Sequence, residues 1–227
     1  MGAEGDESKD TRQRLLESAV DVFAEQGFHQ ATVHEICKGA GANIAAVNYY
    51  FGSKENLYAE AWQKAVRDSL AAHPPDGGVP PDAAAEQRLR GRIAGLVGRG
   101  FDQDSKEPFF MHHELAQPTG LLERLVRETM RPMREQTESV IRELLGPGVP
   151  EREVGYCAMS VHSQCFEVIH RRAHHRRHHP DKDEPHMLVI DDVDAYVEHV
   201  VTFSLGGIRA VRERSGSGAG KPGRGRG

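Results

Sequence analysis

The sequence predicts an all-α protein, and three observations support this prediction. Apolar residues recur at helical spacing in the long segments, and no segment shows convincing strand-like alternation. Residues that cap helices stand at several expected helix starts, among them Thr32, Asn43 and Ser53. Glycine and proline separate the periodic segments. The chain of 227 residues, 38% of them hydrophobic, suits one compact domain and one larger helical domain.

The first expected helix starts at Asp10 or Thr11 and ends at Gly27. Its apolar residues form one stripe, which we expect to pack on the two short helices that follow. The polar residues 1–9 before it are expected to be disordered.

The next stretch reads TVHEICKGAGANIAAVNYYFGSK and begins with a capping box. In such a box the side chains of Thr32 and Glu35 satisfy backbone donors at a helix start. The helix that begins at Val33 can continue only to the break at Gly39-Ala40-Gly41, since glycine allows the chain to reverse.

A second short helix is expected over Ile44–Phe51, capped by Asn43 and ended by Gly52. Two short helices joined by a tight glycine turn form the helix-turn-helix pattern, whose second helix enters the major groove of DNA. Residues 36–54 contain no acidic side chain that would repel phosphate. The DNA-contact candidates are Thr32, Asn43, Ile44, Asn48, Tyr49, Tyr50 and Lys54. For Tyr50, packing and a phosphate contact are equally good interpretations.

The overall charge does not indicate nucleic-acid binding. The net charge is −5, and residues 1–60 carry ten acidic against five basic residues. The prediction of DNA binding therefore depends on where charges lie along the chain. Cys37, Cys157 and Cys165 form no CxxC pair; we interpret them as buried free thiols, with redox sensing as the alternative. The absence of a signal peptide and of a long apolar run predicts a cytoplasmic protein that does not enter the membrane.

Further helices are expected down to about Arg214. A helix capped by Ser53 continues to about Ala72, and a loop rich in proline and glycine follows. The later helices are expected over 86–100, 108–117, 121–145 with a kink or break at Pro132, 151–170, and from Asp191 or Asp192 to 214. The predicted division is a DNA-binding domain over 10–55, a regulatory and dimerisation domain over 56–214, and a disordered basic tail over 215–227.

From Thr11 to about Trp62 the chain resembles the DNA-binding domain of the tetracycline-repressor (TetR) family. The resemblance rests on FAEQGF, HEICKGAGA and VNYYFGSKENLY. The run NIAAVNYYFGSKENLY is most similar to the CecR-like branch, and ELAQPTGLLERLV resembles a later part of the same regulators. Asn48 departs from the pattern, because most of the family has tyrosine there.

The resemblance implies a homodimeric regulator bound to a near-palindromic operator of double-stranded DNA. In the family the last two long helices of each subunit form a four-helix interface. The candidate interface residues here are Cys165, Ile169, Tyr196, Val200, Phe203 and Gly207. The last helix is apolar on more than one face, which also favours an interface.

The resemblance also implies a ligand sensor in the larger domain. A pocket between its helices is expected to be mostly apolar, so the expected effector is a small, largely apolar molecule. The candidate lining residues are Phe110, Met111, His113, Met130, Met133, Cys157, Ser160 and Gln164. For each of these taken singly, core packing is the better interpretation.

No sequence motif indicates catalysis or a cofactor. HHEL at 112–115 is not HExxH, and neither a GxSxG motif nor a P-loop occurs, so we expect no catalytic residues and no enzyme activity. The histidines of the segment His170–His186 could bind a metal, but Pro180 and Pro185 interrupt it. We interpret the segment as a solvated, pH-sensitive loop and predict no metal site.

The function predicted from the sequence is transcriptional repression released by a small ligand. Activation is one alternative. The other is a helical protein-interaction module that does not bind DNA, which the acidic N-terminal part and Asn48 would favour. A salt-dependent shift of a palindromic DNA fragment distinguishes the two classes.

Overall fold

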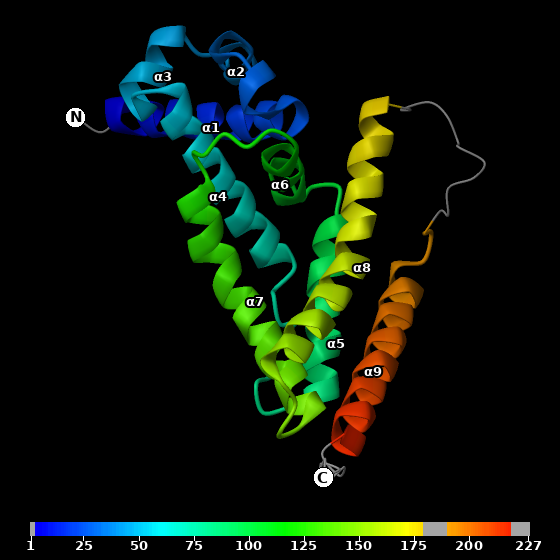
Figure 1. Cartoon of the computed structure of the whole chain (residues 1–227). Coiled ribbons are helices and arrows are strands. Elements are labelled where there is room, and N and C mark those ends of the chain that lie inside the picture. The colour runs from blue at the N-terminus through cyan, green and yellow to red at the C-terminus, as the bar shows by residue number, and fades with distance from the viewer. Residues whose placement is uncertain (1–2, 179–189, 219–227) are drawn as a thin grey trace, which may run out of the picture. The chain divides into compact units, whose positions relative to one another are not determined.

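The computed structural model describes residues 3–178 and 190–218, with side chains for residues 10–167 and 190–216. Within these ranges every regular element is a helix, which confirms the predicted all-α class (Figure 1). The helices are α1 (Ala3–Gln30), α2 (Val33–Ala40), α3 (Ile44–Phe51), α4 (Lys54–Ala72), α5 (Ala85–Phe101), α6 (Glu107–Ala116), α7 (Glu123–Leu145), α8 (Glu151–His178) and α9 (Val193–Gly218). None of these helices combines the length and the apolar character needed to cross a membrane.

Several helices extend beyond their expected limits. α1 begins at Ala3 rather than at Asp10 or Thr11, and α7 continues through Pro132 without a break. α8 continues to His178, because the sequence contains no glycine or proline between the expected end and Pro180. The first part of the His-rich segment is therefore helical and not a loop. α9 continues to Gly218, so residues 215–218, predicted as the start of a disordered tail, are helical. Residues 179–189 and 219–227 lie outside the described part.

The helices pack as two units. The first contains residues up to 72 together with 102–128, and the second contains 73–101 and the described residues from 129 onward. The first unit includes α4 and α6, because both helices pack on α1. Long-range packing of this kind leaves no mark on local sequence periodicity.

An aromatic cluster, Phe23, Phe28, Tyr58 and Phe110, forms the centre of the first unit. The ring of Tyr58 lies edge-on to Phe23 at 4.9 Å and is stacked with Phe110 at 5.5 Å between centroids. Gly27 breaks α1 with a φ of 75°, and Phe28 after it comes within 5.1 Å of Tyr58. Such pairs contribute about 0.5–1.5 kcal/mol each beyond the area they bury. The cluster thereby joins α6 to α1 and α4.

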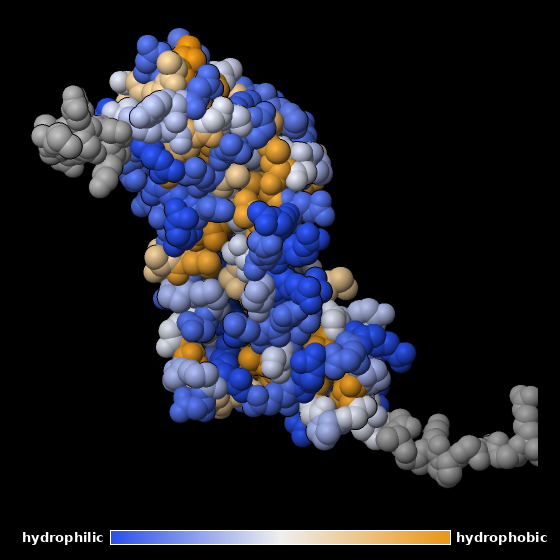
Figure 2. Space-filling model, turned by 90° about the vertical axis from the view of Figure 1, so that its left-hand side faces the viewer, coloured by the Kyte–Doolittle hydropathy of each residue, from blue (hydrophilic) through white to orange (hydrophobic). Residues whose placement is uncertain are grey.

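The core of the second unit is formed by one face from each of four helices. α5, α8 and α9 all contact one another. The C-terminal half of α7 adds Val140, Ile141 and Leu145 to the same core. Hydrophilic side chains cover most of the molecular face in Figure 2, with apolar patches between them.

The loop that follows α4 is held against a row of glycines on α5. Any Cβ atom added at Gly95 would collide with the backbone carbonyl oxygen of Pro74, and one added at Gly91 would collide with that of Asp76. At Gly98 the nearest atoms belong instead to the side chain of His73. Glycine therefore allows the loop backbone to approach the helix backbone directly.

This packing predicts different outcomes for the same substitution at two positions of α5. Gly95→Ala should destabilise the protein by about 1–3 kcal/mol, because the opposing atom is backbone and cannot turn away. Gly98→Ala is the matched control. The His73 ring can move there, and alanine raises helix propensity by up to about 1 kcal/mol, so little net change is expected. Urea unfolding measures both values, and equal stability of the two variants would contradict the explanation.

Candidate DNA-binding surface

The predicted capping box is present at the start of α2. The backbone N–H of Glu35 donates to Oγ1 of Thr32 at 3.2 Å, and the carboxylate accepts from the backbone N–H of Thr32 at 3.0 Å. The Thr32 hydroxyl also donates to this carboxylate at 2.7 Å. These hydrogen bonds lower the pKa of Glu35, the side-chain bond having the largest effect. Thr32 is exposed, but its hydroxyl is already engaged in fixing α2.

Capping residues fix the end of α2 and both ends of α3. At the end of α2, Gly41 takes a left-handed conformation with a φ of 60°, and Ala42 donates its N–H to the carbonyl of Cys37 at 2.9 Å. Oδ1 of Asn43 accepts the N–H of Ala45 at 3.0 Å. Gly52, with a φ of 77°, ends the helix. The expected helix-turn-helix therefore forms with the predicted limits of α3.

α3 has two well-buried residues and several exposed ones. Val47 and Phe51 are buried in the first unit, and the guanidinium of Arg12 lies 4.9 Å above the Phe51 ring. The exposed residues of α3, which we call the α3 surface, are Ile44, Ala45, Asn48 and Tyr49.

The structure brings three of the predicted DNA-contact residues together on the α3 surface. Tyr49 is 80% exposed and Ile44 is 50% exposed, and Asn48 lies between them on the same side of the helix. Tyr50 is half-buried, with its ring 4.8 Å from that of Tyr49. Asn43 is exposed beside this group and acts as the cap of the helix.

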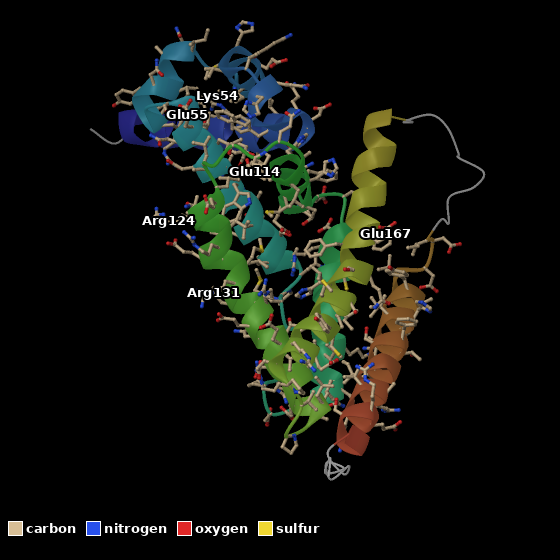
Figure 3. The ribbon with its side chains drawn as sticks, in the orientation of Figure 1. Lys54, Glu55, Glu114, Arg124, Arg131 and Glu167 are labelled. Carbon is tan, nitrogen blue, oxygen red and sulfur yellow. The ribbon has the colours of Figure 1, made fainter. Side chains whose placement is uncertain are left out.

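Lys54 lies at the start of α4, where α4 approaches α3 (Figure 3). Its Nζ atom is 4.4 Å from the centroid of the Phe28 ring, a cation–π arrangement. Partial burial lowers the pKa of Lys54, and the neighbouring charge of Glu55 opposes this shift. Phe28 therefore holds the ammonium group in place. Sequence reasoning assigned no such role to Phe28, because the contact joins the end of α1 to the start of α4.

Polar contacts attach α6 to the same unit. The hydroxyl of Tyr58 donates to Oε1 of Glu114 at 2.7 Å, and Glu114 also accepts from the hydroxyl of Thr119 at 2.8 Å (Figure 3). Burial, reinforced by the bond to Glu114, raises the pKa of Tyr58. Nε2 of His113 lies 3.2 Å from the carbonyl oxygen of Ala24 on α1. Changes in α6 can therefore reach α1 and α4 through direct contacts.

The predicted ligand-lining residues are divided between the two units. Phe110, Met111 and His113 belong to the first unit, where Phe110 is fully buried in the aromatic cluster. The other five belong to the second unit. Among these Cys157 is buried, and Ser160 is exposed with its hydroxyl donating to the carbonyl of Tyr156 at 2.9 Å. The remaining three are Met130, Met133 and Gln164, all half-buried.

The predicted interface residues differ in their exposure in the single chain. Cys165 and Val200 are fully buried in the core of the second unit, so they face their own subunit. Phe203 is 63% exposed, and Gly207 has open space where a side chain would project. Tyr196 is half-buried and donates its hydroxyl to the carbonyl of Gln164 at 2.8 Å. The side chain of Ile169 lies outside the described residues.

Other apolar side chains that sequence reasoning did not select are exposed on α8. They are Tyr156, Met159 and Phe166. Periodicity marks a helix face as apolar, but it cannot tell which of two apolar faces meets the core of the same chain.

The three cysteines are buried and free, as predicted. Burial raises the pKa of all three thiols, that of Cys165 to about 12. The reactive thiolate form is therefore disfavoured at neutral pH. Among the described residues no group of three or more His, Cys, Asp or Glu side chains could hold a metal ion. The side chains of His170–His186 lie outside that part.

Two family profiles together cover most of the chain. Residues 15–61 match the family described as bacterial regulatory proteins, tetR family. Residues 85–208 match the C-terminal domain of the HTH-type transcriptional dual regulator CecR. The second match includes more than half of the chain and lies entirely outside the helix-turn-helix.

Individual relatives support the same assignment. The HTH-type transcriptional dual regulator CecR of Shigella flexneri is 47% identical over 58 residues, which are 26% of this chain and 24% of that protein. The chain thus matches only about a quarter of the length of this curated relative. A TetR-like transcriptional regulator from Rhodococcus sp. RHA1 has a similar fold, with a TM-score of 0.66, 20% identity, and coverage of 88% of this chain and 96% of that one. The transcriptional regulator FadR from Bacillus subtilis, solved in complex with stearoyl-CoA, has a TM-score of 0.61 and 18% identity, with coverage of 86% and 98%.

The capping box predicts a pH-dependent contribution to stability. Because the folded pKa of Glu35 is lowered, its ionised form contributes stability above the ordinary value of 4.5 and loses it as the pH falls through the folded value. Glu35→Gln should therefore unfold at a lower temperature than the wild type near neutral pH, and the difference should shrink in acid. Thermal unfolding between pH 7 and pH 3 measures this. A difference that stayed constant over that range would contradict the prediction.

Proposed function

The chain belongs to the TetR family of transcriptional regulators, in its CecR-like branch, and we propose that it is a homodimeric repressor released from a near-palindromic operator by a small ligand. The observation that carries the proposal is the α3 surface, an exposed helix face without acidic residues. The name of one relative, the transcriptional repressor AcnR of Corynebacterium glutamicum, supports repression. The name of the CecR relative includes dual regulation, so activation remains the alternative.

The α3 surface has the chemistry needed at a DNA groove. The second helix of a helix-turn-helix places its N-terminal residues against base edges, and in α3 these are Ile44 and Ala45. Asn48 offers an amide to a base edge. Tyr49 and Lys54 can donate to phosphate oxygens and so position the helix, with support from Thr32 or Tyr50 at the rim.

The proposal predicts weaker operator binding when the phosphate contacts are removed. Tyr49→Ala and Lys54→Ala should each lower affinity by about 1.5–3 kcal/mol, the value of a hydrogen bond to a charged group. Lys54→Ala should also lower the slope of binding against salt by about one. Lys64→Ala is the matched control, because Lys64 lies further along α4 and pairs with Asp68 at 2.6 Å. Titration of duplex DNA at several salt concentrations gives the affinity of each variant and the slope of its binding against salt. Wild-type affinity in both test variants would show that these residues do not contact the operator.

The proposed dimer interface is the exposed apolar face of α8 and α9. Tyr156, Met159 and Phe203 are each more than half exposed in the single chain. Gly206 and Gly207 have open space where a side chain would project, so a second helix can approach α9 closely. A two-fold dimer through this face would supply two α3 surfaces, matching a near-palindromic operator with half-sites about 34 Å or a multiple apart.

Introducing a charge into this face should separate the subunits. Phe203→Glu is expected to yield monomers with strongly reduced operator affinity, because the glutamate would have to be buried without a partner. Gln87→Glu is the control, since it introduces a negative charge at an exposed position of α5, outside the proposed interface. Light scattering at micromolar concentration measures both. A wild-type protein that is already monomeric there would rule out the proposed interface.

The proposed effector is small and largely apolar. The apolar acyl chain of the ligand in the relative solved with stearoyl-CoA supports this proposal. The contacts of Tyr58 and His113 offer a route by which a change in α6 could reach α1 and α4. An effector needs only to bind the DNA-free form more tightly than the DNA-bound form.

The effector proposal predicts coupling between two binding events. Small apolar compounds, stearic acid, and stearoyl-CoA, whose acyl chain is apolar and whose coenzyme A part is charged, can be screened by thermal shift, and each hit then added to a titration of the operator. An effector should weaken operator binding by about 1–3 kcal/mol, or roughly 5–150-fold. Hits that stabilise the protein but leave operator affinity unchanged would refute the sensor proposal and leave DNA binding intact.

A further inference from the structure

The first turn of α3 presents an apolar side chain where a DNA-binding helix meets base edges. Ile44 is the first residue of the helix, and half of its surface is exposed. Ala45 beside it is also exposed and apolar. The sequence of α3, IAAVNYYF, contains neither arginine nor lysine. The first turn of α3 therefore offers methyl groups to a partner, and α3 carries no cation.

Asn48 is the amide on this surface whose hydrogen-bonding groups remain available. Two nearby asparagines serve the fold: Asn43 accepts the N–H of Ala45, and Asn56 donates to the carbonyl of Phe51 at 3.0 Å. The side-chain amide of Asn48, by contrast, is exposed and has no hydrogen bond to any protein group in the described ranges. Its donor and acceptor are thus free for a base.

These two side chains match the edges of an A·T pair. An apolar side chain recognises the C5-methyl group of thymine, and asparagine pairs with N6 and N7 of adenine in a bidentate manner. The commonest specific contact to guanine uses arginine or lysine, which α3 lacks. Building on the proposed function, we propose that α3 reads A·T pairs, with Ile44 against a thymine methyl and Asn48 on an adenine.

Helix geometry sets the spacing of these two contacts. Ile44 and Asn48 are four residues apart, so they lie on one side of α3 and about 6 Å apart along its axis. Successive base pairs are about 3.4 Å apart. When α3 lies along the groove, the thymine and the adenine are therefore within about two base-pair steps of each other, once in each half-site.

The first test is selection from a pool of duplexes with a random centre of about three helical turns. The full-length wild type should enrich sequences with A·T pairs at two close positions in each half-site. Ile44→Ala should relax the preference at one of these positions and Asn48→Ala at the other. G·C pairs at the positions that the variants relax would overturn the proposal. Failure to enrich any duplex would refute the proposed DNA binding itself, and this inference with it.

The second test changes the DNA and leaves the protein intact, so it does not depend on the folding of a variant. In the selected duplex, replacing the contacted thymine by deoxyuridine removes one methyl group and should weaken wild-type binding about fourfold. Replacing the contacted adenine by 7-deazaadenine removes N7 and should weaken binding by at least about fivefold.

The variants supply the matched controls for the second test. Ile44→Ala should be insensitive to deoxyuridine at that position, and Asn48→Ala to 7-deazaadenine. Deoxyuridine outside the half-sites should have no effect on the wild type. Full wild-type affinity for both modified duplexes would overturn the proposal while leaving the proposed DNA binding intact. Equal sensitivity in wild type and variants would assign the contacts to other residues and overturn it as well.

Discussion

The function of this protein depends on holding one very short helix in place. α3 has eight residues, too few to be stable alone in water, so its order comes from its surroundings. Asn43 and Gly52 satisfy its ends, and burial of Val47 and Phe51 fixes its orientation on the first unit. Because these residues hold the helix, its exposed residues Ile44, Asn48 and Tyr49 can meet a partner without disturbing the core.

An acidic protein can still offer a surface suited to DNA, because the placement of charges matters more than their sum. The net charge is −5, yet α3 carries no charged residue. The ammonium group of Lys54 is fixed beside it by the Phe28 ring. Neutral donors and few cations imply a modest electrostatic contribution to affinity, so specificity should depend mainly on direct contacts with the bases.

Local sequence signals were sufficient for the helix-turn-helix and insufficient for the parts made by long-range packing. The Thr32–Glu35 box and both ends of α3 were predicted correctly, since capping involves residues close in sequence. The placement of α6 in the first unit depends on Phe110 and Glu114 meeting Tyr58, a contact that no local pattern reveals. Cys165 and Val200 are fully buried in the core of the second unit, and periodicity could not show this, because α8 and α9 have more than one apolar side.

Hydroxyl-radical footprinting of the DNA upstream of the adjacent genes tests the central claim most directly. Two α3 surfaces related by a two-fold axis should protect two patches on one face of the duplex, centred about one or more helical turns apart, or roughly 34 Å per turn. The two protected sequences should be inverted copies of each other. A single protected patch, or no protection at a salt concentration at which the protein is folded, would contradict the account.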